Sequence, residues 1–411
     1  MINTYNNEIK GVEIIILTLI VMLVPPISQL FGTNLIKLVE DFMYLLTILL
    51  SFRLIVKKRV AFKIPLFLGI FILSFFVFIM VGIYYNGIAM VVLQIRELKY
   101  LFLLLILLPY IECRQFDKVW LILKIIAFLS VPIAVLQWMN ANGDGDLISG
   151  LMGYGGSGTL SLFLLIVFFT EFTLRLQSSK RLLGFYFILL FPTMINETKI
   201  SIVLYPLMLI IAFWLTKKLN LKNVIMIGII IMLLLTAWAT MYKYTYKKSF
   251  SQIVSQKYIS SYMYNTNWDT DMGRIDKIKY AYQIIKDDNL FFGYGLGSSY
   301  YGKSSGIEGY IYDMHSRKKL FSGTRPQLFV SLIEEGAVGV LIIIGVILSI
   351  LIKLLSADFS INKCISIFSI IVILISLVYQ HIFYTYQIMY IFLFYTFLCY
   401  RYDISKAKLR A

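Results

Sequence analysis

Residues 224–235 read VIMIGIIIMLLL, an unbroken apolar run from Val224 to Leu235. The run shows no alternation between apolar and polar positions, so it is typical of a buried helix and not of a strand with one solvated face. Inside a bilayer the backbone must satisfy its hydrogen bonds within the protein, which leaves helices or a closed barrel. The run therefore predicts a transmembrane helix.

Similar runs recur along nearly the whole chain, each close to the roughly 20 residues that a bilayer crossing requires. They predict twelve spans, at 12–31, 38–56, 64–84, 91–111, 118–138, 158–176, 182–196, 198–216, 221–240, 327–352, 361–379 and 382–400. The first run contains Pro25 and Pro26 in place of a small-residue cleavage site. This pattern indicates a membrane anchor and not a removable signal peptide.

The composition excludes a soluble domain. Of the 411 residues, 59% are hydrophobic and only 15% are charged, too few charges for the surface of a soluble protein of this length. The net charge of +16 does not indicate nucleic-acid binding, because most basic residues lie in short clusters between the spans. Three cysteines without ligand spacing and two histidines predict no disulfide framework and no metal site. We expect no cofactor.

The basic clusters also predict the orientation, because positive residues are retained on the cytoplasmic side. With the N-terminus inside, every cytoplasmic segment is basic: Arg53–Lys63, Glu112–Lys118, Arg175–Arg181, Lys217–Lys222, Lys353–Lys363 and Arg401–Arg410. The external turns at Tyr84–Gly87, Asn140–Gly158 and Tyr379–Phe383 contain no Lys or Arg. The expected fold is an all-α polytopic membrane protein with about 12 transmembrane helices and both termini cytoplasmic.

Residues 241–326 form one large external loop of 86 residues without a plausible span. The expected organisation is therefore nine spans in 1–240, a loop domain in 241–326, and three spans with a short tail in 327–411. The loop holds 13 of the 29 tyrosines, and 13 basic residues against seven acidic ones. Such a surface suits a ligand that is part anionic and part ring-shaped, or an interfacial belt on lipid headgroups.

Charged residues near membrane depth are candidates for function. Arg96 and Lys99 are three residues apart, so they share a helix face and could hold a phosphate group, the arginine through two parallel contacts. The structural alternative is that both extend toward the lipid headgroups. Lys199 lies in a tight external hairpin at Asn196–Lys199, where it could also face an anion or simply form part of a turn.

Two further motifs lie in the second half of the loop and at the start of the span that follows it. Asp271-Met272-Gly273-Arg274 opens an amphipathic helical pattern, followed by Phe292-Gly293-Tyr294-Gly295-Leu296-Gly297; its alternating glycines suit close backbone approach. Arg325 and Pro326 precede a span that contains Glu334-Glu335-Gly336. Arg325 would thus lie at a helix N-terminus, where the free N–H groups favour an anion.

These motifs together resemble the O-antigen ligase and Wzy-type polysaccharide polymerase superfamily, over residues ~270–340. The resemblance rests on Gly273-Arg274, on Phe292–Gly297, and on Leu328 through Glu334-Glu335-Gly336 to Gly339. Two departures favour the polymerase branch over the ligase. Arg325 occupies the place where the ligase-like pattern usually has a histidine, and Thr198-Lys199 replaces a Ser-Arg pair before an earlier span.

The resemblance implies a GT-C-like, metal-independent inverting glycosyltransferase of the bacterial inner membrane that makes O-antigen of lipopolysaccharide, or capsule. Its implied donor and acceptor are undecaprenyl-pyrophosphate-linked oligosaccharides, with a chain-length regulator as a possible partner and no nucleic acid. The expected catalytic residues are Arg325, Arg274, Arg96 and Lys199. The expected substrate-binding residues are Lys99, Tyr294, Gly293, Gly295, Gly297, Glu334 and His315. Candidates for the general base are Glu197, Asp271, Asp276 and His315.

Two other functions compete with polymerisation. One is O-antigen ligation, with lipid A-core as the acceptor. The other is a flippase or transporter of lipid-linked oligosaccharide, which would also have many spans. Transporters often show internal repeats with broken helices at matching positions. The halves of this chain show no convincing repeat, and the single large loop is asymmetric.

Overall fold

The computed structural model describes residues 66–98, 113–140, 144–152, 156–178, 183–196, 198–218, 220–247, 255–265, 272–302, 306–315 and 325–381, with a few single residues between them. The predicted spans at 12–31 and 382–400, nearly all of 38–56 and the second half of 91–111 lie outside these ranges. Six of the described helices are long and apolar enough to cross a membrane, and two shorter apolar helices accompany them. The predicted all-α membrane class is confirmed.

The elements before the large loop are α3 (Leu66–Glu97), α5 (Cys113–Asn140), η2 (Gly145–Leu147), η3 (Gly150–Met152), α6 (Ser157–Ser178), α7 (Leu183–Tyr186), η4 (Phe187–Leu190), α8 (Phe191–Ile195), α9 (Ser201–Leu215) and α10 (Leu221–Tyr246). The loop contains α12 (Gln256–Met263), α13 (Arg274–Ile285), β1 (Tyr301–Gly302), β2 (Ile307–Glu308) and α14 (Tyr310–His315). The helices α15 (Gln327–Leu355) and α16 (Ile361–Tyr379) follow. The strands β1 and β2 pair antiparallel, with Tyr301 opposite Glu308.

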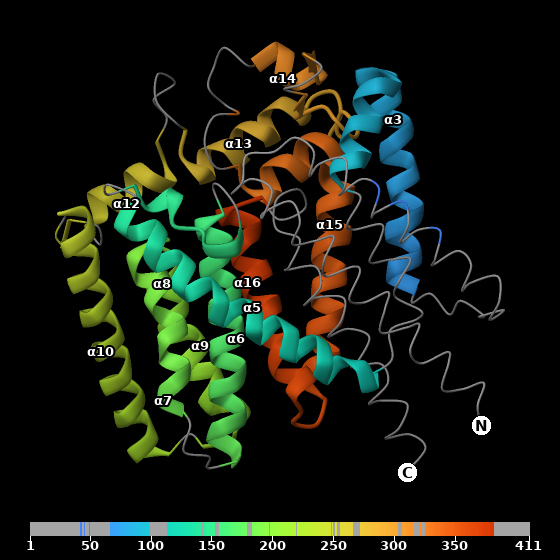
Figure 1. The fold of residues 1–411 in the computed structure, drawn as a ribbon. Coiled ribbons are helices and arrows are strands. Elements are labelled where there is room, and N and C mark those ends of the chain that lie inside the picture. Colours follow the sequence, from blue (N-terminus) through green and yellow to red (C-terminus); the bar gives the residue numbers. More distant parts are fainter. Residues whose placement is uncertain are drawn as a thin grey trace, which may run out of the picture.

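The turns predicted to be external lie at one end of the helix bundle, together with α12, α13 and α14 (Figure 1). The described turns between α9 and α10 and between α15 and α16, which are predicted to be cytoplasmic, lie at the opposite end (Figure 1). This arrangement is the alternation that the charge pattern requires. The α10 helix runs six residues past the predicted span, because Trp238, Tyr242 and Tyr246 stack along one face with ring centroids 4.7 and 4.6 Å apart.

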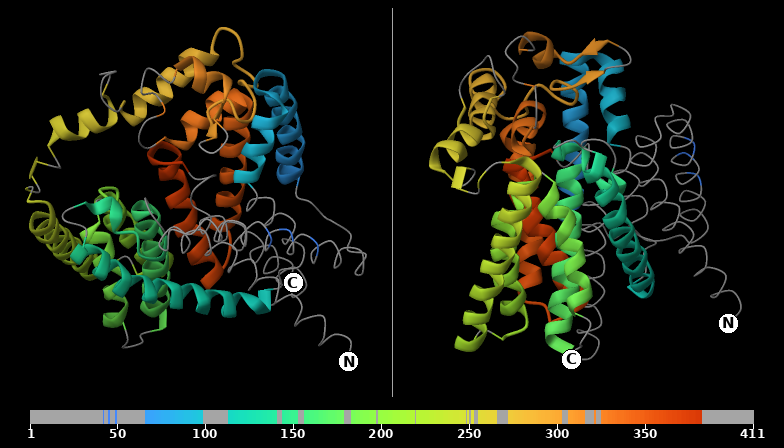
Figure 2. Two further views of the ribbon diagram at one scale, coloured as in Figure 1. Left: turned by 45° about the horizontal axis from the view of Figure 1, so that its top comes forward. Right: turned by 60° about the vertical axis from the view of Figure 1, so that its left-hand side comes forward.

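The α3 helix is a hairpin of two arms, as the predicted turn at Tyr84–Gly87 requires. Gly87 has φ 75° and ψ 161°, and the chain reverses there (Figures 1 and 2). A Cβ added to Gly82 would lie 3.0 Å from Cγ2 of Val91, whereas nine residues of continuous helix would separate these positions by about 13 Å. The predicted turn is therefore confirmed, and its external location stays a prediction.

The α15 helix is broken at Gly336, which has φ 65° and ψ −164°. Residues 290–294 of the loop fill the break. The backbone N–H of Tyr294 donates to the carbonyl of Ile333 at 2.8 Å, and the N–H of Ala337 donates to the carbonyl of Leu290 at 2.8 Å. A helix can be interrupted at membrane depth only where other protein groups satisfy its freed backbone, and here the glycine-rich loop does so.

The alternating glycines allow this loop to lie directly on two helices. A Cβ on Gly293 would lie 2.5 Å from the carbonyl oxygen of Ile333 in α15, and one on Gly295 would lie 2.0 Å from the backbone nitrogen of Gly82 in α3. Both glycines also have positive φ, 61° and 75°. The motif therefore has a packing role, set by close backbone approach and left-handed conformation.

Replacing Gly295 by alanine should prevent this packing. Left-handed backbone costs an alanine about 1–2 kcal/mol, and overlap with backbone atoms adds roughly 1–3 kcal/mol or more. Gly306→Ala is the matched control, because Gly306 has φ +66° but no atom within 4 Å of an added Cβ. We expect detergent-purified Gly295→Ala to melt well below Gly306→Ala. Equal melting temperatures would refute the packing role.

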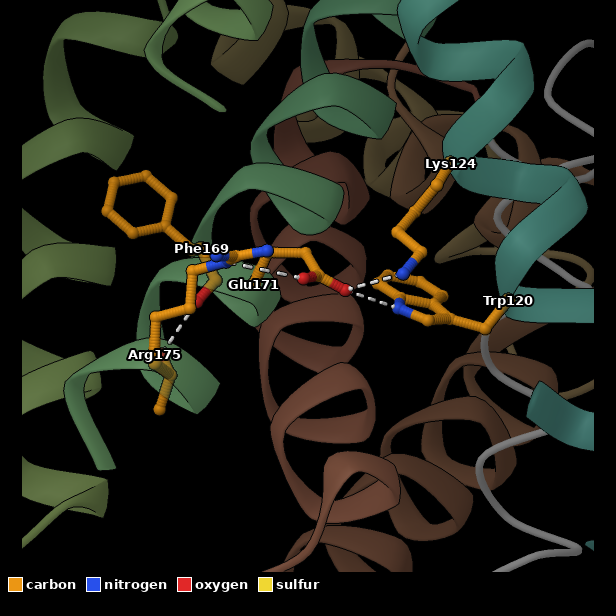
Figure 3. Close-up of polar contacts among 6 residues, drawn as sticks. Trp120, Lys124, Phe169, Glu171 and Arg175 are labelled. Atoms are coloured by element: carbon orange, nitrogen blue, oxygen red, sulfur yellow. Dashed lines mark hydrogen bonds and ion pairs between the residues drawn. The ribbon is translucent and has the colours of Figure 1, made fainter. Parts of the chain in front are cut away.

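The core is built around α6, whose side chains are almost all buried from Ser157 to Thr173. This helix packs against α5, α9 and α16. Its Glu171 is a buried carboxylate that accepts a 2.8 Å hydrogen bond from Nε1 of Trp120, lies 3.2 Å from Nζ of Lys124 and 3.8 Å from Nε of Arg175 (Figure 3). Glu171 is not among the residues predicted from the sequence to be functional. Its contacts tie α5 to α6.

Candidate functional site

The chain is extended where α16 ends, and two helices dock on this segment. Gln380 has φ −153° and ψ 169°. The carbonyl of Tyr379 accepts a 2.8 Å hydrogen bond from Nε of Arg274, the first residue of α13. The carbonyl of Gln380 accepts a 3.1 Å bond from the backbone N–H of Gln327, the first residue of α15. His381 follows and is buried.

Three helix N-termini meet at this segment. The α13 and α15 helices begin at the hydrogen bonds just described, after N-cap residues Gly273 and Pro326. The α6 helix also begins here, because a Cβ on Gly158 would lie 3.1 Å from the side-chain oxygen of Gln380. Helix N-termini carry partial positive charge and free N–H groups, and they favour anions. The end of α16 is thus placed where an anion would be stabilised.

The charged groups of Arg274 and Lys199 both lie over the ring of Tyr262. The guanidinium of Arg274 is buried, 4.0 Å from the ring centroid of Tyr262 and 4.6 Å from that of Tyr379. Nζ of Lys199 lies 5.3 Å from the ring centroids of both Tyr258 and Tyr262. Cations over ring faces are stabilised by the ring quadrupole. Tyrosines of α12 therefore bring together two predicted cations that are far apart in sequence.

Arg325 lies just before the N-cap of α15, which is the position predicted from the sequence, and its side chain is half-buried. Its Nη1 donates a 2.9 Å hydrogen bond to the carbonyl of Ser299. His381 lies beyond the end of α16. Burial, and then the positive charge of Arg325, hold the pKa of His381 well below the ordinary histidine value. The backbone N–H of Gln327, two residues after Arg325, bonds to the carbonyl of Gln380, which precedes His381, so the two residues lie close together. With its lowered pKa, the imidazole is neutral at pH 7.

Glu334 lies in the first half of the broken α15 and is buried. Its Oε1 accepts a 2.6 Å hydrogen bond from Oγ of Ser299, and its Oε2 accepts a 3.2 Å bond from Nε2 of Gln94. Gln94 belongs to the second arm of α3 and is fully buried, whereas Arg96, two residues later, is exposed. Gln94 therefore connects α3 to α15.

Tyr294 packs among aromatic rings at the tip of α3. Its ring centroid lies 5.2 Å from that of Tyr85 and 5.6 Å from that of Tyr310. Gly297 passes close to Met90, since an added Cβ would lie 2.8 Å from its Cγ. Tyr294 and the three glycines of the motif therefore each have a packing contact, and their expected role in substrate binding stays a prediction.

The remaining predicted residues are not part of this cluster or are not described. Lys99 lies outside the described residues, as do the base candidates Glu197 and Asp271. His315 ends α14, and its side chain is not described. Asp276 lies on α13 with its Oδ1 3.6 Å from Nζ of Lys279.

His381 and Lys277 are two buried residues that were not predicted from the sequence. His381 lies within the predicted external turn at Tyr379–Phe383, and its rarity in the chain could have marked it, since there are two histidines. Lys277 is fully buried on the same face of α13 as Arg274. Their three-residue spacing places them together on a helix and could have drawn attention to it.

The fold and the site define a polytopic helical membrane protein with cations gathered at one end of the bundle. Residues 184–328 match the protein family described as O-antigen ligase. The match runs from α7 to the start of α15 and includes Lys199, Arg274 and Arg325. The predicted resemblance to the O-antigen ligase and polymerase superfamily is thereby confirmed. Comparisons with curated proteins and with solved structures find no significant match.

Proposed function

We propose that this protein is a polysaccharide polymerase, an inverting glycosyltransferase that joins undecaprenyl-pyrophosphate-linked oligosaccharide units at the external face of the bacterial inner membrane. The observation that carries the proposal is the convergence of Lys199, Arg274 and Arg325 around the end of α16. These residues come from three separate segments within the family match. Three helix N-termini meet at the same place.

The proposed reaction uses these groups as follows. A sugar hydroxyl of one lipid-linked unit attacks the anomeric carbon of another, and the bond from that carbon to the pyrophosphate oxygen breaks. The pyrophosphate departs with the bonding electron pair, and fixed cations stabilise the charge that develops on it. His381 accepts the proton of the attacking hydroxyl, since it is neutral and lies beside Arg325. The cations take the role that a metal ion would otherwise have.

Polymerase function is preferred because Arg325 occupies the position of the histidine in the ligase-like pattern. Ligation to lipid A-core is the second candidate. It is favoured by His381, which the fold brings beside Arg325 from a different part of the chain. The two functions share the donor and the leaving group, so the acceptor distinguishes them.

Purified protein should be incubated with lipid-linked repeat units alone, and separately with lipid A-core as well. A ladder of products from the first mixture supports polymerase function, and it should persist in EDTA. Glycan transfer that requires lipid A-core would assign the ligase instead. Loss of the ladder in EDTA with recovery on adding a divalent ion would overturn the metal-independent mechanism. No transfer in either mixture would overturn glycosyl transfer.

The pH dependence should report His381. A general base must be unprotonated, and a lowered pKa keeps His381 neutral as the pH falls through the ordinary histidine value of about 6.5. The rate at limiting substrate should therefore stay constant from pH 7.5 to below 6.5 and fall only in more acidic buffer. In Arg325→Gln, loss of the neighbouring charge should move this fall to higher pH.

His381→Ala should lower the rate roughly 100- to 10,000-fold, the usual contribution of a general base. The variant should keep the melting temperature of the wild type within a few degrees if its role is chemical. A wild-type acid limb at or above pH 6.5, or a near-normal rate in His381→Ala, would exclude His381 as the base.

A further inference from the structure

The buried carboxylate of Glu334 collects hydrogen bonds from two distant segments. Oγ and the backbone N–H of Ser299 donate to Oε1 at 2.6 and 3.3 Å, and Nε2 of Gln94 donates to Oε2 at 3.2 Å. Glu334 is 1% exposed. Burying a polar group is costly unless it is hydrogen-bonded, and the donors from Ser299 and Gln94 meet this requirement.

Ser299 links this carboxylate to Arg325. The side chain and N–H of Ser299 face Glu334, while its carbonyl accepts the 2.9 Å hydrogen bond from Nη1 of Arg325. The neighbouring loop is held as well, because Nδ2 of Asn86 donates to the carbonyls of Tyr294 and Leu296 at 3.1 and 3.2 Å. The carbonyl that receives Arg325 is thus on a fixed backbone.

The guanidinium of Arg325 is planar and carries its donors in a rigid fork. One donor engaged by a fixed carbonyl sets the direction of the remaining donors. A loose arginine would contact a pyrophosphate in many orientations, whereas an oriented one is ready as the charge develops. Preorganised donors of this kind stabilise transition states more than ground states.

We propose that Glu334 is a positioning residue for Arg325, acting through Ser299, and that it does not itself contact the substrate. Gln94 anchors the second oxygen of the carboxylate. This assignment rests on the proposed function, in which Arg325 stabilises the departing pyrophosphate. It differs from the substrate-binding role expected for Glu334 from the sequence.

A double-mutant cycle tests the proposal. Glu334→Gln keeps the shape of the side chain but leaves one acceptor oxygen for donors that come from two segments. We expect Glu334→Gln and Ser299→Ala each to lower kcat about 10- to 100-fold with little change in KM, because the loss falls on transition-state stabilisation. Ser299→Thr, which retains the hydroxyl, should recover activity. Glu335→Gln, at the adjacent position, is the matched control and should remain near wild type.

In an Arg325→Ala background, Glu334→Gln should cause no further loss, because residues that act as one unit are not additive. Full additivity of the two substitutions, or normal activity of Ser299→Ala, would overturn the positioning role. Ser299→Ala keeps the test decisive if Glu334→Gln does not fold. A wild-type protein that makes no glycan product, by contrast, would count against the proposed function itself.

Discussion

Arg325→Ala should slow polymer-ladder formation by roughly 30- to 1000-fold. Charge-assisted contacts that strengthen as the pyrophosphate departs are each worth on the order of 2–4 kcal/mol of barrier, and each factor of ten in rate corresponds to about 1.4 kcal/mol. Arg325 combines three features: it precedes the N-terminus of α15, it lies beside His381, and its guanidinium is oriented by Ser299. We expect a larger loss here than at Arg96, which is exposed.

Arg325→Lys should recover only part of the activity, because lysine restores the charge but not the planar fork. Lys286→Ala is a suitable control, since the Lys286 side chain is 46% exposed beyond the end of α13. Rates should be measured on variants with the melting temperature of the wild type. Near-normal ladders from Arg325→Ala would refute the mechanism.

Glu171→Gln should produce the largest loss of stability, about 3–5 kcal/mol, which is the usual cost of removing one partner of a buried ion pair. The substitution leaves Lys124 and Arg175 with an uncompensated positive charge between α5 and α6. Glu171 lies about 20 Å along α6 from Gly158 and hence from the candidate site. The specific activity of the folded fraction should therefore be unchanged.

Reversible unfolding in mixed detergent micelles would measure the free energy of unfolding directly. Adding Lys124→Met to Glu171→Gln should recover part of the loss, because one of the unpaired charges is removed. Glu308→Gln, on the exposed strand β2, is the control and should change the free energy little. If Glu171→Gln is as stable as Glu308→Gln, the charges around Glu171 do not hold α5 on α6.

The sequence by itself determined the class of protein and the positions of several of its apolar helices. Apolar runs such as Val224–Leu235 are local signals, because a helix in a bilayer satisfies its own backbone and needs only length and hydrophobicity. The reversal within α3 could also be predicted, since the segment Tyr84–Gly87 ends in a glycine, which adopts φ 75°. Gly273-Arg274, Phe292–Gly297 and Arg325 lie inside the family match, so the superfamily could be inferred from the motifs that contain them.

Only the tertiary structure decided which side chains share the site. Gln94 and Arg96 are two residues apart on one helix, and hydrophobic periodicity cannot tell which of them faces protein when both lipid and protein surroundings are apolar. The fold turns Gln94 to Glu334 and leaves Arg96 exposed. It likewise brings His381 to Arg325, 56 residues earlier in the chain. These contacts depend on how whole helices pack, and neither residue's local sequence carries information about its distant partner.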